Sequence, residues 1–353
     1  KTADADGSNT PGVWKVKVAP HGPTDCSASQ PYRVQVTLQT DLDLTVKWIE
    51  VTQVTQEYLF NTIKMVRGKP TLARVYVGTG DAAGPIHDVA VELWGYNDCL
   101  GCTPLPGSPL YLGSHTMFKT PTQTQRLSAD AFQVYLPASW QQANTLYLRA
   151  RVYSLNSHQI ETKTYNNNGE EIAFFVNKGY VHVAIVPVLA AGVMPPYLNN
   201  PDLDVLVAYM RDTYPTSGIQ LWLPASGQGI AANYDYTNHQ IPGCGTGWGA
   251  LLNDLALYYK KIKGPPAGFL MYGILDNSVP YHFSGCGSYD KRVSAGILGT
   301  GDDNLAHEAG HMLGLPHAPC GNPQSPDPNF PTYNNPLGGT YPSASIGEVG
   351  VRL

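Results

Sequence analysis

The segment His307–His317, with the sequence HEAGHMLGLPH, decides how the C-terminal half of the chain is interpreted. Residues four positions apart lie on the same face of an α-helix, so His307 and His311 can bind one metal ion together. Glu308 is rotated by about 100° from His307. This rotation keeps the Glu308 carboxylate from binding the ion but leaves it near enough to hydrogen-bond a water molecule bound to the ion. The segment therefore predicts a helix that carries two metal ligands and a general base.

The residues after His311 predict a third ligand. Gly314 can adopt the left-handed conformation that ends a helix, and Pro316 resists further helix, so the chain can turn back and bring His317 to the ion. Three neutral imidazoles leave one position for water, and zinc in such a site lowers the pKa of that water to about 7. We expect one catalytic Zn²⁺. A structural zinc, closed by Cys320 as a fourth ligand, is the alternative.

The sequence around this segment, residues 179–353, has the pattern of strands alternating with helices of 3.6-residue period. Apolar residues with helical spacing predict one helix near 201–214 and a second near 251–262, and Asp302 and Asp303 suit the start of a third helix, which carries the histidines. Short apolar runs predict strands over 180–189, 219–223, 268–275 and 295–298. The pattern indicates a small mixed sheet with helices, followed by an irregular C-terminal part.

The first half has a different pattern. From about residue 12 to 178, short runs of β-branched and aromatic residues are separated by turn clusters such as Asn166–Gly169. That spacing is typical of an antiparallel sandwich. We therefore predict an α+β protein with a β-rich, sandwich-like accessory domain over residues 1–178 and a second domain over 179–353 that carries the metal site.

Composition excludes two classes of function. The formal net charge is −5 and no basic run occurs, so the phosphate-neutralising surface of a nucleic-acid-binding protein is not expected. The most apolar stretch, Tyr180–Tyr197, is interrupted by three prolines and falls short of the roughly 18 apolar residues that a spanning helix requires. No membrane span is predicted.

Cysteine usage bears on the compartment. The six cysteines are even in number and lie in loop-like sequence, as expected of disulfides in an oxidising compartment. We therefore predict a secreted protein. Buried free thiols in a cytosolic protein are the alternative. Cys244 and Cys286 are the first predicted pair. Cys99 and Cys102 are interpreted as structural, because no second Cys-x-x-Cys completes a four-thiolate zinc site.

The histidine segment resembles the motif of the metzincin clan of zinc endopeptidases, His-Glu-x-x-His-x-x-Gly-x-x-His, at every defined position. The resemblance implies His307, His311 and His317 as zinc ligands and Glu308 as catalytic base. It implies a secreted peptidase of bacterial type whose substrate is an extracellular protein or peptide. It also implies that the strand at Ala295, Gly296, Ile297 and Leu298 is the edge that pairs with the substrate backbone.

One feature departs from the clan. Its members have a Met-containing turn below the zinc, yet no Met follows Met312 in this sequence. Either the chain stops before that turn and a separate C-terminal fragment carries it, or the protein is an atypical member; we favour the first explanation. A non-catalytic extracellular adhesion, glycan-binding or protein-binding module with a vestigial or structural zinc is the alternative function. Hydrolysis of a non-peptide amide is a third.

Further side chains are candidates for supporting roles. Tyr333 and Tyr341 are candidate oxyanion donors, although packing or surface roles are favoured for both. Asp302 and Asp303 are candidate Ca²⁺ ligands, although helix capping is favoured.

Overall fold

The computed structural model describes residues 42–352, except for 58, 81–84, 98, 100–101, 119–124, 127–130, 157–160, 162, 197, 239–242, 262–267, 320–322, 324–325, 331–349 and 351. Tyr333, Tyr341, Cys26 and Cys320 therefore lie outside the described residues, as do positions 1–41 of the predicted accessory domain.

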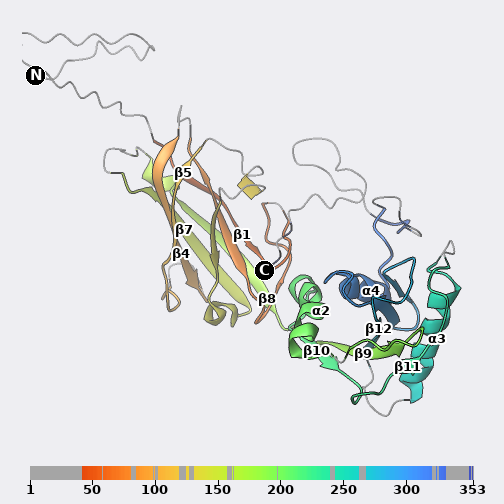
Figure 1. Cartoon of the computed structure of the whole chain (residues 1–353). Helices are drawn as coiled ribbons and strands as arrows, with labels where there is room; N and C mark the ends of the chain where they lie inside the picture. The colour runs from red at the N-terminus through yellow and green to blue at the C-terminus, as the bar shows by residue number, and fades with distance from the viewer. Residues whose placement is uncertain are drawn as a thin grey trace, which may run out of the picture. The chain divides into compact units, whose positions relative to one another are not determined.

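The β-rich part contains two sheets (Figure 1). The first has the order β1-β3-β6 and is antiparallel throughout. The second has the order β2-β8-β7-β4-β5, in which only β2 and β8 run parallel. The strands are β1 (Thr45–Thr52), β2 (Met65–Val66), β3 (Leu72–Gly78), β4 (Ile86–Tyr96), β5 (Leu110–Met117), β6 (Phe132–Tyr135), β7 (Thr145–Ser154) and β8 (Asn168–Val176), with 3₁₀ turns at Ala138–Gln141 and Thr164–Asn166.

Alternating side chains from both sheets form one hydrophobic core. Along β4, Val89, Val91 and Leu93 are fully buried, and along β7 the same holds for Leu146, Leu148, Ala150 and Val152. This spacing of two is what a strand with one buried face requires. The two sheets therefore share a single apolar interior, to which β1, β3 and β8 also contribute.

The outer face of the first sheet buries charge. Glu50 of β1 is fully buried and accepts a hydrogen bond from Arg126 Nη2 at 2.9 Å, while Arg74 Nη1 lies 3.6 Å from its carboxylate. The Tyr76 hydroxyl also donates to Glu50. Burial, with the Glu50 charge beside it, holds the pKa of Tyr76 far above its usual range, so the phenol stays protonated. The buried carboxylate is therefore paired with two arginines and a phenol.

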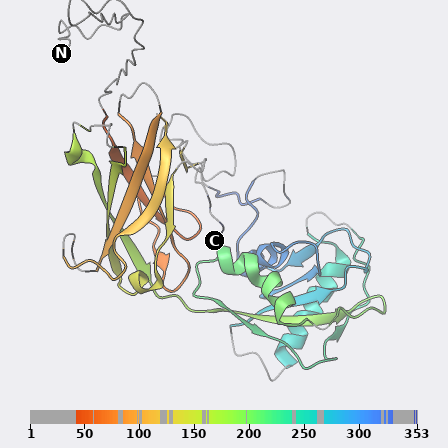
Figure 2. The ribbon, with the colours of Figure 1, turned by 60° about the vertical axis from the view of Figure 1, so that its left-hand side comes forward.

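The C-terminal part is built on a third sheet (Figure 2). Its strand order is β10-β9-β12-β14-β13, with β11 paired to β9. All neighbours are parallel except β13, which runs antiparallel to β14 at the end of the sheet. The strands are β9 (Val181–Leu189), β10 (Ile219–Trp222), β11 (Ile230–Ala231), β12 (Leu270–Leu275), β13 (Gly285–Gly287) and β14 (Val293–Ile297).

Helices cover both faces of this sheet. Helix α3 (Thr246–Lys261) packs Trp248, Leu251 and Leu255 into one core with alternate residues of β9 and β12. Helices α2 (Asn200–Thr213) and α4 (Asn304–Met312) pack into a second core with the remaining strand residues. Strands buried on both faces explain the nearly continuous apolar sequences of β9 and β12.

The predicted α+β class is confirmed, because helices and several sheets coexist in the described residues. The predicted boundary near residue 178 falls between β8 and β9, which belong to different sheets.

Across the described residues, no helix is long and apolar enough to cross a membrane. The predicted Cys244–Cys286 disulfide is present, and Cys99 is bonded to Cys102.

Candidate metal centre

Helix α4 positions two of the three histidines. It runs from Asn304 to Met312, so His307 and His311 lie one turn apart on its surface, as predicted. Asp303 stands at its N-cap but makes no side-chain capping bond. Leu305, Ala306, Ala309 and Met312 bury the opposite face of the helix. The apolar face therefore fixes the helix against the sheet and leaves the histidine face toward a cavity.

The end of α4 brings the third histidine back. Gly314 has a φ of 86°, and its N–H donates to the His311 carbonyl at 2.9 Å, while Leu315 N–H donates to the Gly310 carbonyl at 3.0 Å. These bonds cap the last carbonyls of the helix and reverse the chain. His317 then forms an isolated bridge with Pro326 and returns to the cavity. The helix end predicted at Gly314 is confirmed.

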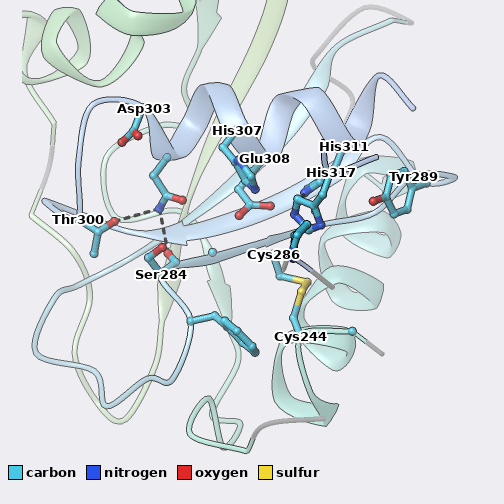
Figure 3. A pocket seen from close by; sticks show the side chains of 16 residues that line it. Cys244, Ser284, Cys286, Tyr289, Thr300, Asp303, His307, Glu308, His311 and His317 are labelled. Carbon is cyan, nitrogen blue, oxygen red and sulfur yellow. Dashed lines mark hydrogen bonds between the residues drawn. A yellow bond between two sulfur atoms is a disulfide. The ribbon is translucent and has the colours of Figure 1, made fainter. Parts of the chain in front are cut away.

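The three imidazoles converge (Figure 3). One ring nitrogen from each of His307, His311 and His317 lies within 4.8 Å of the others, and the Nε2 atoms of His311 and His317 are 3.1 Å apart. The Nδ1 atom of His311 lies 2.8 Å from the Leu315 carbonyl. A proton on Nδ1 satisfies that carbonyl and leaves the Nε2 lone pair directed at the other histidines. The arrangement could hold a metal ion.

The histidines are electrostatically suited to bind a cation. Burial, with the neighbouring imidazoles adding to it, lowers the pKa of His307 and of His311. A lowered pKa means that both rings are neutral near pH 7, the form in which an imidazole binds metal. Within the described residues, the triad is the only group of three or more His, Cys, Asp or Glu side chains close enough to share an ion. Among the described residues, Asp302 and Asp303 do not belong to such a group.

Glu308 lies beside the triad and is almost fully buried, with an exposed fraction of 5%. Its Oε2 atom is buried and has no hydrogen-bond partner. Burial raises the pKa of Glu308 to about 8. A cation held by the histidines would favour the ionised carboxylate and supply the missing electrostatic partner. The unpaired oxygen therefore fits a site that is completed by an ion and its water.

Strand β13 forms the wall opposite Glu308. A Cβ atom on Gly285 would lie 2.7 Å from Glu308 Oε1, and one on Gly287 would lie 3.0 Å from Glu308 Oε2 and 2.8 Å from the Cβ of His311. Only glycine allows this approach without displacement. The disulfide from Cys286 to Cys244 ties the strand to the loop before α3. Sequence reasoning did not identify β13.

The start of β13 is held to α4 by a side-chain amide. Asn304 Nδ2 donates to the Ser284 carbonyl at 2.9 Å and to Thr300 Oγ1 at 3.0 Å (Figure 3). Ser284 is the residue before β13, and Asn304 opens α4. The amide therefore links the strand, the helix and the loop between β14 and α4, and it sets the width of the site at this end.

The expected edge role of Ala295–Leu298 is wrong. Residues 295–297 belong to β14, which is hydrogen-bonded to β12 on one side and to β13 on the other. Leu298 N–H, just past the strand, donates to the Leu275 carbonyl. No backbone groups of β14 are left along an open edge, because the three residues of β13 occupy that position. The open edge next to the histidines is β13 itself.

The histidines, Glu308 and β13 surround a cavity of about 560 Å³. Its lining also includes Tyr289, Phe283 and Thr300. The Tyr289 ring centroid lies 5.2 Å from that of His311, in an edge-on arrangement. Burial, with the nearby Glu308 charge adding to it, raises the pKa of Tyr289, so its phenol is protonated at neutral pH. Tyr289 was not predicted from the sequence.

Neither a comparison with protein-family models nor a comparison with curated proteins finds a match to this chain.

Proposed function

We propose that the chain is a secreted, metzincin-like zinc endopeptidase. The observation that carries the proposal is the convergence of His307, His311 and His317 beside a buried carboxylate with a free oxygen. A structural site usually closes with a fourth protein ligand and favours Cys. Here three imidazoles border a cavity of about 560 Å³, large enough for a peptide segment.

Zinc is the metal that this donor set suits best. Neutral imidazoles are preferred ligands of zinc, and three of them with a fourth open position are found in catalytic zinc sites. When bound, zinc supplies Lewis-acid chemistry, which lowers the pKa of a water molecule and polarises a carbonyl group. The Leu315 carbonyl supports the geometry, because its contact with His311 Nδ1 orients that ring.

Glu308 is proposed to move the proton. Its carboxylate accepts a proton from the attacking water as the water oxygen bonds to the carbonyl carbon of the peptide. It then delivers that proton to the peptide nitrogen as the carbon–nitrogen bond breaks, with the bonding electrons going to nitrogen. The second water proton stays on the new carboxyl group and passes to the released amine, so the products are a carboxylate and an ammonium group. Burial raises the pKa of Glu308, and a cation at the histidines would oppose that shift and favour the ionised carboxylate that can act as the base.

Strand β13 is proposed to bind the substrate backbone. It is the terminal strand of its sheet and lines the cavity beside Glu308 and the histidines. An extended peptide can add to such an edge by main-chain hydrogen bonds. Because Gly285 and Gly287 let Glu308 lie directly against the strand, a peptide bound along β13 would lie close to that carboxylate.

The proposal includes the arrangement of the chain. Residues 1–178 would form an accessory domain that positions substrate, and residues 179–353 the catalytic domain. Two disulfides support an oxidising, extracellular setting for both the enzyme and its protein or peptide substrate.

The test combines metal content with cleavage. We expect one zinc per chain by elemental analysis and cleavage of a diverse peptide library by the zinc-loaded protein. Chelation with 1,10-phenanthroline should abolish cleavage, and added zinc should restore it. The Glu308→Gln variant should keep its zinc but lose at least about 1000-fold in kcat. Glu170→Gln, at an exposed glutamate of β8, is the matched control and should retain full activity.

Three outcomes would contradict the proposal. Zinc binding without any cleavage would favour a binding module with a vestigial site. Equal cleavage by the parent and by Glu308→Gln would remove the carboxylate from the reaction. Cleavage of small amides without cleavage of any peptide would redirect the proposal to a non-peptide hydrolase.

A further inference from the structure

Tyr289 occupies a place in the cavity that the proposed mechanism has not used. It lies in the turn 288–292 between β13 and β14 and packs edge-on against His311, with 5.2 Å between ring centroids. Figure 3 shows its hydroxyl on the side that faces His311 and His317. Almost half of the side chain is exposed, so the ring borders the open cavity and is not part of a core.

The turn holds Tyr289 in a defined position. Ser288 N–H donates to the Val293 carbonyl at 3.0 Å, which continues the β13–β14 pairing past the end of β13. The Ser288 hydroxyl donates to Asp290 Oδ1 at 2.6 Å, and Arg292 has a left-handed φ of 53°. A donor that is fixed before the reaction stabilises developing charge without reorganisation, which is the property that makes such groups effective.

Two other side-chain donors in the cavity, those of Asn304 and Thr300, already have partners. Asn304 Nδ2 donates to the Ser284 carbonyl and to Thr300 Oγ1, and the Thr300 hydroxyl donates to the Ile297 carbonyl at 2.8 Å. Within the described part of the chain, the Tyr289 hydroxyl makes no hydrogen bond. Among the cavity hydroxyls, Tyr289 alone has its ring against a histidine of the triad. Its hydroxyl is therefore the group best placed to meet a second oxygen at the site.

We propose that Tyr289 is a catalytic residue that donates a hydrogen bond to the carbonyl oxygen of the scissile bond. This inference rests on the proposed peptidase function. Addition of the water oxygen moves the carbonyl π electrons onto that oxygen, which becomes negative and accepts the phenol hydrogen bond more strongly than the ground-state carbonyl does. The phenol keeps its proton throughout, and Glu308 alone transfers one.

The first test is kinetic and uses the full chain. Tyr289→Phe keeps the ring against His311 and removes only the hydroxyl. We expect kcat to fall by about 100-fold with KM nearly unchanged, the size of effect typical for loss of one such donor. Zinc affinity should equal that of the parent, because the ring and the ligands are untouched. Tyr281→Phe, at an exposed tyrosine before β13, is the matched control and should change neither value.

The second test is a binding measurement that does not depend on turnover. A phosphinic dipeptide, Ala-Ψ[PO₂CH₂]-Ala, carries a tetrahedral group with an oxygen that imitates the reacting carbonyl oxygen, whereas a mercaptoacetyl dipeptide binds zinc through sulfur and lacks that oxygen. Calorimetry on zinc-loaded protein should show the phosphinate bound about tenfold or more weakly by Tyr289→Phe than by the parent. The thiol should bind both proteins equally.

Each outcome bears on the inference. Unchanged kcat together with equal phosphinate affinity overturns the donor role of Tyr289 and leaves the peptidase proposal intact. A loss of zinc affinity in Tyr289→Phe overturns it in favour of a metal-ligand role. If the parent cleaves no peptide, the proposed function fails, and the ratio of phosphinate affinities still decides whether the phenol serves that oxygen. A parent that binds neither probe overturns both proposals.

Discussion

The Nε2 atoms of His311 and His317 lie 3.1 Å apart, although His311 belongs to α4 and His317 follows it by six residues. A continued helix would carry residue 317 about 9 Å further along the axis, so the approach depends on the reversal at Gly314. Gly314 has a φ of 86°, where a Cβ atom is disfavoured for steric reasons. The third ligand is thus a consequence of one backbone conformation.

Gly314→Ala should therefore weaken metal binding. A Cβ at residue 314 would meet no other atom within 4 Å, so the cost is the left-handed backbone itself, about 1 kcal/mol. We expect roughly a fivefold to tenfold loss of zinc affinity, measured by competition with a fluorescent chelator. Gly249→Ala, on the exposed surface of α3, is the control and should leave affinity unchanged while it stabilises the helix. Equal zinc affinity in both variants would contradict the claim that the third ligand depends on the backbone conformation of Gly314.

Gly287→Ala should open the gap between β13 and α4. The added Cβ would lie 2.8 Å from the Cβ of His311 and 2.9 Å from the Glu308 carbonyl oxygen, and the backbone atoms among these cannot rotate away. We expect a loss of about 1–3 kcal/mol in the free energy of unfolding and a fall in kcat. Urea unfolding and peptide cleavage measure the two effects. Gly179→Ala, where no atom lies within 4 Å, should change neither.

The metal ligands could be predicted from the sequence because their spacing follows directly from helix geometry. His307 and His311 are four residues apart, and Gly314 marks the helix end, so no information from distant segments was needed. The Cys244–Cys286 pair was predictable because both residues lie in glycine-rich sequence in the same half of the chain.

The edge strand could not be predicted in the same way. Gly285, Cys286 and Gly287 contain no β-branched or aromatic residue, and three residues are too few to show an alternating pattern. The longer strand at 293–297 has that apolar character because it is buried between two neighbours. The apolar sequence pattern therefore pointed to the interior strand β14 and not to the edge strand β13. Tyr289 was missed because only the tertiary fold brings it to His311.

The two disulfides should differ in their contributions to stability. Cys244 and Cys286 are separated by 42 residues, whereas Cys99 and Cys102 are separated by three. The entropy of loop closure gives about 4 kcal/mol for the long loop and about 2 kcal/mol for the short one. Replacing both cysteines of each pair by serine, followed by urea unfolding monitored by circular dichroism, compares them. A larger loss for the Cys99–Cys102 pair would rule out loop entropy as the main term.

The buried pair of Glu50 and Arg126 should be the most sensitive polar contact in the β-rich part. Both side chains are almost inaccessible, with exposed fractions of 0% and 2%, and Arg126 Nη2 donates to Glu50 at 2.9 Å. Arg126→Ala removes the strongest partner of a carboxylate that water cannot reach. We expect the free energy of unfolding to fall by about 3–5 kcal/mol, because an uncompensated buried charge is left behind.

Arg149→Ala provides the matched comparison for that pair. Arg149 also donates to a glutamate, Glu170, at 2.7 Å, but the two side chains are 34% and 46% exposed. Water solvates either partner once the other is removed, so the loss should stay below about 1 kcal/mol. Thermal and urea unfolding of both variants measure the difference. Equal losses would mean that burial does not determine the strength of these two ion pairs, and that Arg74 compensates for Arg126 at Glu50.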